Sequence, residues 1–271
     1  MSTVGLIQMC STADVAANLL SAERLVQDAA DAGARTVMLP EAFAIVSGAR
    51  ARIAAAESLE GGGPILDRCR ALAQRAQVDL VLGGFPEACD TSRSYNTLVH
   101  LAADGSIRHR YRKLHLFDVQ LGDGTVLAES RSTAAGEAIA VADLPCGPTG
   151  LTICYDMRFP ALYQALVDAG AEVLVAPSAF TATTGRAHWH LLLRARAVEC
   201  QCWMLAAAQI GDHGAGRRSY GHALAVDPWG EVKLDLGNGI GFGLVEVDLA
   251  EVARVRRELP SLTHRRTIPT P

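Results

Sequence analysis

The stretch GLTICYDMRFP, residues 150–160, combines the end of an apolar segment, a short polar loop and the start of a helix. The apolar run ends at Cys154, and Pro160 stands where proline is favoured, in the first turn of a helix. This order predicts a strand that leads through a loop into a helix, with the thiol of Cys154 near the loop's backbone N–H groups. Strand-to-helix units of this kind are typical of α/β proteins.

Segments on both sides of this stretch alternate between strand and helix patterns. Two features fix boundaries: Asp14 precedes the first apolar position of a helical pattern, and Asp104-Gly105 is a strong hairpin signal. The expected strands are 4–9, 36–39, 80–84, 94–102, 107–111, 151–154, 173–177, 203–209, 222–226, 232–236 and 241–247. The expected helices are 14–32, 65–76, 160–168, 187–201 and one that follows Asp248. The pattern predicts an α/β protein with mixed sheets and helices packed outside them, and a four-layer sandwich is compatible with it.

The bulk composition excludes several classes of protein. The 271 residues are 49% hydrophobic and 20% charged, as in ordinary globular proteins. A net charge of −4 gives no basic field for nucleic acid, and the longest apolar runs are too short to cross a bilayer. Gln8 interrupts the first apolar run and no basic residue precedes it, so we expect no signal peptide. Seven cysteines without regular spacing argue against a disulfide framework and favour a reducing, cytoplasmic compartment.

Cys154 is a candidate nucleophile because it ends an apolar strand next to N–H groups that can stabilise an oxyanion. The same local sequence is also typical of a buried structural cysteine. A thiol needs a neighbouring base or cation to react at neutral pH. None of the eight histidines lies in a recognisable triad motif, although a cysteine hydrolase with a histidine base remains an alternative.

Glu41 and Lys113 are the other candidates. Glu41 follows an apolar strand, at the carboxyl end where active-site groups of α/β sheets often lie. The 25 basic residues include only two lysines, Lys113 and Lys233, so the other 23 are arginines. The use of lysine at position 113 in such a chain indicates a site that needs a compact ammonium in place of a planar guanidinium. The alternatives are chance or a surface position for Lys113, and a solvated loop carboxylate for Glu41.

Three of these segments, in this order, resemble the catalytic blocks of the nitrilase-like carbon–nitrogen hydrolase family. They are Pro40-Glu41, Tyr111-Arg112-Lys113-Leu114-His115-Leu116 and Cys154-Tyr155-Asp156-Met157-Arg158-Phe159-Pro160. Further blocks agree along essentially the whole chain: Pro177-Ser178-Ala179-Phe180, Ala187-His188-Trp189, Arg194-Ala195-Arg196-Ala197-Val198-Glu199, Tyr220-Gly221-His222 and Val226-Asp227-Pro228-Trp229-Gly230.

The resemblance implies one αββα sandwich domain over residues 1–271 that forms a homodimer or a higher homo-oligomer. It implies a Cys–Glu–Lys site that uses no metal and no organic cofactor. In that site Cys154 is the nucleophile, Glu41 the base and Lys113 the cation, and the backbone N–H of Tyr155 assists with the oxyanion. Glu129 matches the family's second glutamate, which helps to position the lysine.

The residues around the nucleophile narrow the substrate class. Within the family that the chain resembles, nitrilases usually carry Cys-Trp-Glu, so the resemblance implies amides rather than nitriles for Cys-Tyr-Asp at 154–156. Met157 stands where carbamoylases of that family carry an additional arginine. Three segments resemble the deaminated glutathione amidase branch: Ala187-His188-Trp189, Ala206-Ala207-Ala208-Gln209 and Ser219-Tyr220-Gly221-His222. That branch hydrolyses α-ketoglutaramyl-cysteinylglycine to 2-oxoglutarate and cysteinylglycine. The alternatives are an ω-amidase acting on α-ketoglutaramate and a non-catalytic binding protein with the same fold.

Both keto-acid substrates carry a carboxylate, which requires a cationic partner in the site. Arg158 is the candidate, because a guanidinium binds carboxylate through two parallel hydrogen bonds. An ion pair between Arg158 and Asp156 or another carboxylate is the structural alternative. By the same resemblance, Phe180 and Thr184 match positions that line the substrate pocket.

Overall fold

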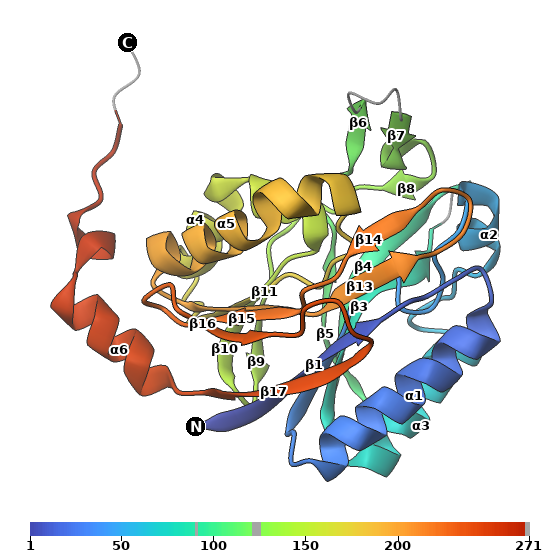
Figure 1. Ribbon diagram of the computed structural model, residues 1–271, viewed down its shortest axis with the longest axis horizontal. Coiled ribbons are helices and arrows are strands. Elements are labelled where there is room, and N and C mark those ends of the chain that lie inside the picture. The colour runs from blue at the N-terminus through green and yellow to red at the C-terminus, as the bar shows by residue number, and fades with distance from the viewer. Residues whose placement is uncertain (90–91, 121–125, 269–271) are drawn as a thin grey trace.

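The computed structural model describes residues 1–89, 92–120 and 126–268 (Figure 1). Its helices are α1 (Val15–Asp31), α2 (Ala49–Ala54), α3 (Pro64–Ala76), α4 (Pro160–Asp168), α5 (Ala182–Cys200) and α6 (Leu249–Glu258), with short 3₁₀ helices η1 (Glu129–Arg131), η2 (Cys154–Arg158) and η3 (Ser261–His264).

Two sheets form the centre of the molecule. The first contains β1 (Ser2–Met9), β2 (Thr36–Leu39), β3 (Asp79–Ala88), β4 (Ser94–Leu101), β5 (Ile107–Arg112), β8 (Thr133–Ala134), β13 (Ala208–Asp212), β14 (Arg218–Tyr220) and β17 (Gly241–Val247). The second has the order β16 (Val232–Asp235), β15 (Leu224–Val226), β12 (Trp203–Ala206), β11 (Val173–Val175), β10 (Gly147–Leu151) and β9 (Val141–Leu144). A small separate hairpin pairs β6 (Asp118–Gln120) with β7 (Val126–Ala128). Both large sheets mix parallel and antiparallel pairs.

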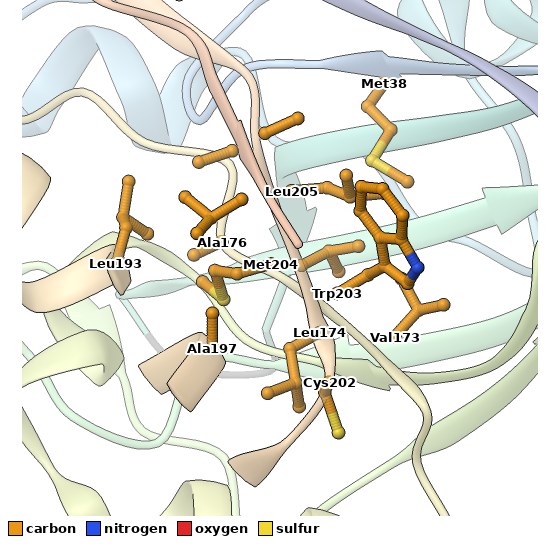
Figure 2. Close-up of a cluster of buried hydrophobic side chains, with 14 of the residues drawn as sticks. Met38, Val173, Leu174, Ala176, Leu193, Ala197, Cys202, Trp203, Met204 and Leu205 are labelled. Atoms are coloured by element: carbon orange, nitrogen blue, oxygen red, sulfur yellow. The ribbon is translucent and has the colours of Figure 1, made fainter. Parts of the chain in front are cut away.

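Two hydrophobic clusters fill the space between four layers. One cluster joins α1 and α3 to the outer face of the first sheet. The other joins the inner faces of both sheets to α4 and α5, and it includes Met38 of β2 and Met204 of β12. Figure 2 shows part of this second cluster, with side chains from both sheets and from α5. In Figure 1 α1 and α3 lie together on one side of the molecule, and α4 and α5 lie on the other. The predicted mixed α/β sandwich is therefore confirmed.

Local signals predicted several element boundaries. Asp14 is the N-cap of α1, which begins at Val15. Its carboxylate accepts a hydrogen bond from the N–H of Ala17. Pro160 is the first residue of α4. The hairpin around Asp104-Gly105 is also present, as β4 and β5.

The bounds of several predicted elements differ from the structure, and three of these differences change the local path of the chain. The strand expected at 151–154 ends at Leu151, and Cys154 begins η2 instead. Helix α5 begins five residues earlier than expected, at Ala182. The strand expected at 203–209 is divided: β12 pairs with β11 and β15 in the second sheet, whereas β13 pairs with β1 and β14 in the first. The chain passes from one sheet to the other at Ala207, and a strand pattern does not record which sheet its residues join.

Across the described residues, no helix combines the length and the apolar composition needed to span a bilayer.

Candidate active site

Cys154 lies where the chain leaves β10 and turns toward α4. Its backbone has a φ of 47°, in the left-handed region that non-glycine residues rarely adopt. The N–H of Cys154 donates to the carbonyl of Pro177 at 3.1 Å, which ties the turn to the loop after β11. Strained backbone of this kind persists where the surrounding structure holds it, and it is frequent at active sites.

The side chain of Asp156 stabilises this turn through hydrogen bonds. Its buried carboxylate accepts hydrogen bonds from the hydroxyl of Tyr111 at 2.7 Å, from the N–H of His115 at 3.0 Å and from the N–H of Ile153 at 2.9 Å. Nδ1 of His115 lies 2.8 Å from the same carboxylate. The predicted alternative for Arg158, an ion pair with Asp156, is therefore wrong, because other partners occupy that carboxylate.

Lys113 lies between two carboxylates. Its Nζ is 2.9 Å from Oε1 of Glu41 and 2.9 Å from Oε2 of Glu129, and all three side chains are almost completely buried. Glu41 follows β2, Lys113 follows β5, and Glu129 begins η1. The structure thus brings together three ionisable residues that are far apart in the sequence.

Asn96 of β4 bridges the two carboxylates and was not predicted from the sequence. Its Nδ2 donates to Oε1 of Glu41 at 2.9 Å and to Oε1 of Glu129 at 3.1 Å. Each carboxylate also accepts a hydrogen bond from the backbone. The N–H of Ala179 donates to Oε2 of Glu41 at 2.9 Å, and the N–H of Phe117 donates to Oε2 of Glu129 at 2.8 Å. An asparagine in a strand carries no local signal of such a role, because its partners come from distant segments.

Burial and charge together set the protonation of the three central groups. Burial raises the pKa of Glu41, but the charge and hydrogen bond of Lys113, together with the hydrogen bonds from Cys154 and from the N–H of Ala179, leave that pKa below its ordinary value. Burial and the charge of Glu41 raise the pKa of Cys154 well above its ordinary value, against the smaller lowering effect of Lys113. Burial lowers the pKa of Lys113, yet Glu129 and Glu41 together raise it well above its ordinary value. The resting site therefore holds a carboxylate, a thiol and an ammonium.

A cavity of about 950 Å³ opens onto this cluster. Its lining includes Glu41, Lys113, Glu129, Cys154, Tyr155, Arg158, Phe180 and Thr184, so every predicted site residue borders one space. Cys154 itself is partly exposed there. Among the described residues no acceptor is recorded for the backbone N–H of Tyr155, the group beside the thiol that the prediction assigned to the oxyanion.

The guanidinium of Arg158 lies 5.1 Å from the ring centre of Phe180 and 5.8 Å from that of Tyr155. Its nitrogens come within 3.3 Å of Nδ1 of His188, and none of the ion pairs among the described residues involves it. A cation in a cavity with no carboxylate partner is suited to an anionic ligand.

The pKa of Cys154 is shifted mainly by burial, by the charges of Glu41 and Lys113 and by the backbone at Ala179. The cavity-lining His213 bonds instead to the carbonyl of Ser11 and to the hydroxyl of Ser219. The described residues therefore favour a glutamate base over the histidine alternative.

The sequence is similar to known proteins over most of its length. The sequence profile of the carbon-nitrogen hydrolase family matches residues 3–257. A deaminated glutathione amidase of Homo sapiens is 43% identical over 269 residues, which cover 97% of this chain and 82% of that protein. A deaminated glutathione amidase of Synechocystis is 40% identical over 264 residues, covering 96% of each.

Solved structures give the same result. The NitFhit protein of C. elegans superposes with a TM-score of 0.91 at 37% identity, covering 98% of this chain but only 65% of the worm chain. Nit3 of Saccharomyces cerevisiae, a member of branch 10 of the nitrilase superfamily, superposes with a TM-score of 0.84 at 30% identity, covering 96% of this chain and 94% of Nit3.

Proposed function

The chain belongs to the carbon-nitrogen hydrolase family and is an amidase, and we propose that its substrate is deaminated glutathione, α-ketoglutaramyl-cysteinylglycine. The observation that carries the proposal is the cavity in which a thiol, a carboxylate and an ammonium meet beside the unpaired guanidinium of Arg158. The products would be 2-oxoglutarate and cysteinylglycine.

The proposed mechanism begins at Cys154. Glu41, which rests as a carboxylate, accepts the thiol proton as the sulfur attacks the amide carbonyl. The ammonium of Lys113 and the backbone N–H of Tyr155 stabilise the oxyanion of the tetrahedral intermediate. Glu41 returns the proton to the leaving amine, and a thioester remains on Cys154. Glu41 then removes a proton from water, which attacks the thioester carbonyl. The C–S bond breaks, the carboxylate product leaves, and Glu41 returns its proton to the sulfur of Cys154.

Glu129 and Asn96 act as positioning residues in this scheme. Glu129 shares Lys113 with Glu41 and is itself fixed by the N–H of Phe117. Asn96 donates to both carboxylates and so keeps their separation constant. This support holds the ammonium and the base in place before substrate arrives, which is where much of the catalytic effect of such groups originates.

Arg158 is proposed to bind the carboxylate of the α-keto acid, above the apolar wall that Phe180 provides. Further arginines line the same cavity, including Arg52 and Arg218, and they suit a substrate with a second carboxylate. A volume of about 950 Å³ also exceeds the needs of α-ketoglutaramate. Both features favour the dipeptide adduct over the smaller ω-amidase substrate.

Purified protein is assayed for product from deaminated glutathione, α-ketoglutaramate and a simple aliphatic amide, with Cys154→Ala beside each. The proposal predicts that the wild type has its highest kcat/KM on the dipeptide adduct and that Cys154→Ala hydrolyses none of the three compounds. Faster turnover of α-ketoglutaramate would assign the ω-amidase reaction instead. If none of the three compounds were hydrolysed, the result would favour the non-catalytic alternative.

The Arg158→Ala variant is expected to lose activity on the two keto-acid substrates while it still hydrolyses the simple amide. Equal losses of activity on all three substrates would contradict the role assigned to Arg158.

We also propose that the chain forms at least a homodimer in a cytoplasmic, reducing compartment. Exposed apolar side chains gather where α5 meets the turn between β15 and β16: Leu191, Val198 and Trp229 are 67%, 47% and 52% exposed. Arg194 joins the two segments by donating to the carbonyl of Gly230 at 2.9 Å. A reducing compartment is supported by six cysteines that are free thiols: Cys10, Cys69, Cys146, Cys154, Cys200 and Cys202. Light scattering of Trp229→Glu tests the assembly, since a dimer through this patch must dissociate.

A further inference from the structure

A second cluster of ligating side chains lies outside the active-site cavity. It consists of His190 on α5, His222 in the segment between β14 and β15, and Asp235 at the end of β16. Their ligand atoms all lie within 4.8 Å of one another, and no other such group of three is found in the described part of the chain. None of the three residues lines the cavity of Cys154.

The spacing of these atoms matches a metal's coordination sphere. Oδ2 of Asp235 lies 3.0 Å from Nε2 of His190 and 3.2 Å from Nδ1 of His222. Ligands about 2.0 Å from a tetrahedral Zn²⁺ lie roughly 3.3 Å from each other. Two of the three edges of the ligand triangle are therefore already close to the required length.

The chemistry of the imidazoles also allows metal binding. A neutral imidazole can bind a metal through one nitrogen when its proton resides on the other. Nδ1 of His190 and Nε2 of His222 have no recorded hydrogen-bond partner among the described residues, so each is free to carry that proton. The side chains of His190 and Asp235 are 35% and 32% exposed, which lets water supply the fourth ligand.

The backbone fixes two of the ligands in advance. Oδ1 of Asp235 accepts the N–H of Gly237 at 2.8 Å, which orients the carboxylate and directs Oδ2 toward His190. His222 has a φ of 57°, and its N–H and carbonyl are held by Gly237 and by the indole of Trp189 at 3.0 and 2.8 Å. Both residues therefore present their ligand atoms without rearrangement of the main chain.

We propose that His190, His222 and Asp235 form a Zn²⁺ site that fastens α5 to β16 and to the segment before β15. Two imidazoles and one carboxylate, with one open position, are donors that suit zinc. The site lies apart from the reacting groups, so bound Zn²⁺ stabilises the fold and leaves the amidase mechanism unchanged. The proposal does not depend on which amide is the substrate.

Full-length protein, stripped of metal with a chelator and dialysed, is titrated with ZnCl₂ by calorimetry, and thermal unfolding is recorded with and without Zn²⁺. The wild type is expected to bind one Zn²⁺ per chain at this site and to gain several degrees in Tm. His190→Ala is expected to bind at least about tenfold more weakly and to lose the gain in Tm. His264→Ala, which removes an exposed histidine outside the cluster, and Cys154→Ala, which removes the reactive thiol, both keep the site.

In the titration, three outcomes overturn the proposal: no binding by the wild type, equal affinity in His190→Ala, or loss of binding in Cys154→Ala alone. Asp235→Asn serves as the second variant, because it keeps a side chain of the same shape while removing the charged ligand. Co²⁺ provides an independent readout: a thiolate charge-transfer band in the wild-type complex would assign the metal to cysteine and contradict the site proposed.

Discussion

Lys113 and Lys233 are the two lysines of the chain, and each meets two carboxylates, but only one of them is buried. Lys113 is 2% exposed and lies 2.9 Å from both Glu41 and Glu129. Lys233 is 42% exposed and lies 3.4 Å from Asp227 and 3.1 Å from Glu231. The number of partners is the same, so the difference in environment must determine what each lysine contributes.

Water accounts for that difference. At the surface, water and salt screen an ion pair, and its net contribution is small. In the cluster the three side chains are almost completely buried, so removing the ammonium leaves two poorly solvated carboxylates without their cation. The comparison shows that the same set of charges contributes little at the surface, whereas we propose that it is required for catalysis in the buried cluster.

The largest effect is expected for Lys113→Met. It removes the ammonium that balances two buried carboxylates, and we expect a loss of about 3–5 kcal/mol in the free energy of unfolding and at least about 10³-fold in kcat/KM. Urea unfolding and product assays measure the two quantities. Wild-type stability in this variant would mean that the ammonium of Lys113 does not stabilise the carboxylate of Glu41, contrary to the lowered pKa of that group.

Asn96→Asp is expected to have the next largest effect. The substitution keeps the size of the side chain but replaces the donor shared by Glu41 and Glu129 with a third carboxylate, and we expect kcat/KM to fall by about 10²-fold. Asn96→Ala, which removes the donor without adding charge, is the matched control and is expected to lose about tenfold. Equal losses in the two variants would show that charge at this position is unimportant.

The pH dependence of kcat/KM, measured on a simple amide, tests the electrostatics without a mutation. The pKa of Glu41 is depressed below its ordinary 4.5, so the base is ionised above that value and activity is lost only as the pH falls through the depressed pKa. The pKa values of Cys154 and Lys113 are raised well above 9.0 and 10.5, which moves the alkaline loss upward. We expect a plateau from about pH 6 to about pH 9. An acid limb centred near pH 7 would instead show that burial raises the pKa of Glu41.

Lys233→Met is expected to have the smallest effect. The lysine is exposed, so the free energy of unfolding should change by no more than about 0.5 kcal/mol, with kcat/KM unchanged. Any difference in Tm from the wild type should disappear in about 1 M salt, where charges are screened within roughly 3 Å. A stability loss that survives high salt would place Lys233 in a desolvated network and would erase the contrast with Lys113.

Local chemistry in the sequence determined many elements of the fold. The carboxylate of Asp14, the ring of Pro160 and the Asp104-Gly105 turn act within a few residues of themselves, so their effect does not depend on the rest of the molecule. The ordered blocks around Glu41, Lys113 and Cys154 likewise identified the family and the candidate catalytic groups before any contact was known.

Only the tertiary structure decided how those groups meet. The division of the strand after Trp203 between two sheets depends on which strand edges are open beside it, and the bridging role of Asn96 depends on carboxylates 55 and 33 residues away. The left-handed turn at Cys154 is likewise held by Pro177 and by the bonds to Asp156. A sequence pattern records the preferences of each residue for its near neighbours, whereas burial, partner choice and pKa arise from atoms that only folding brings within hydrogen-bonding distance.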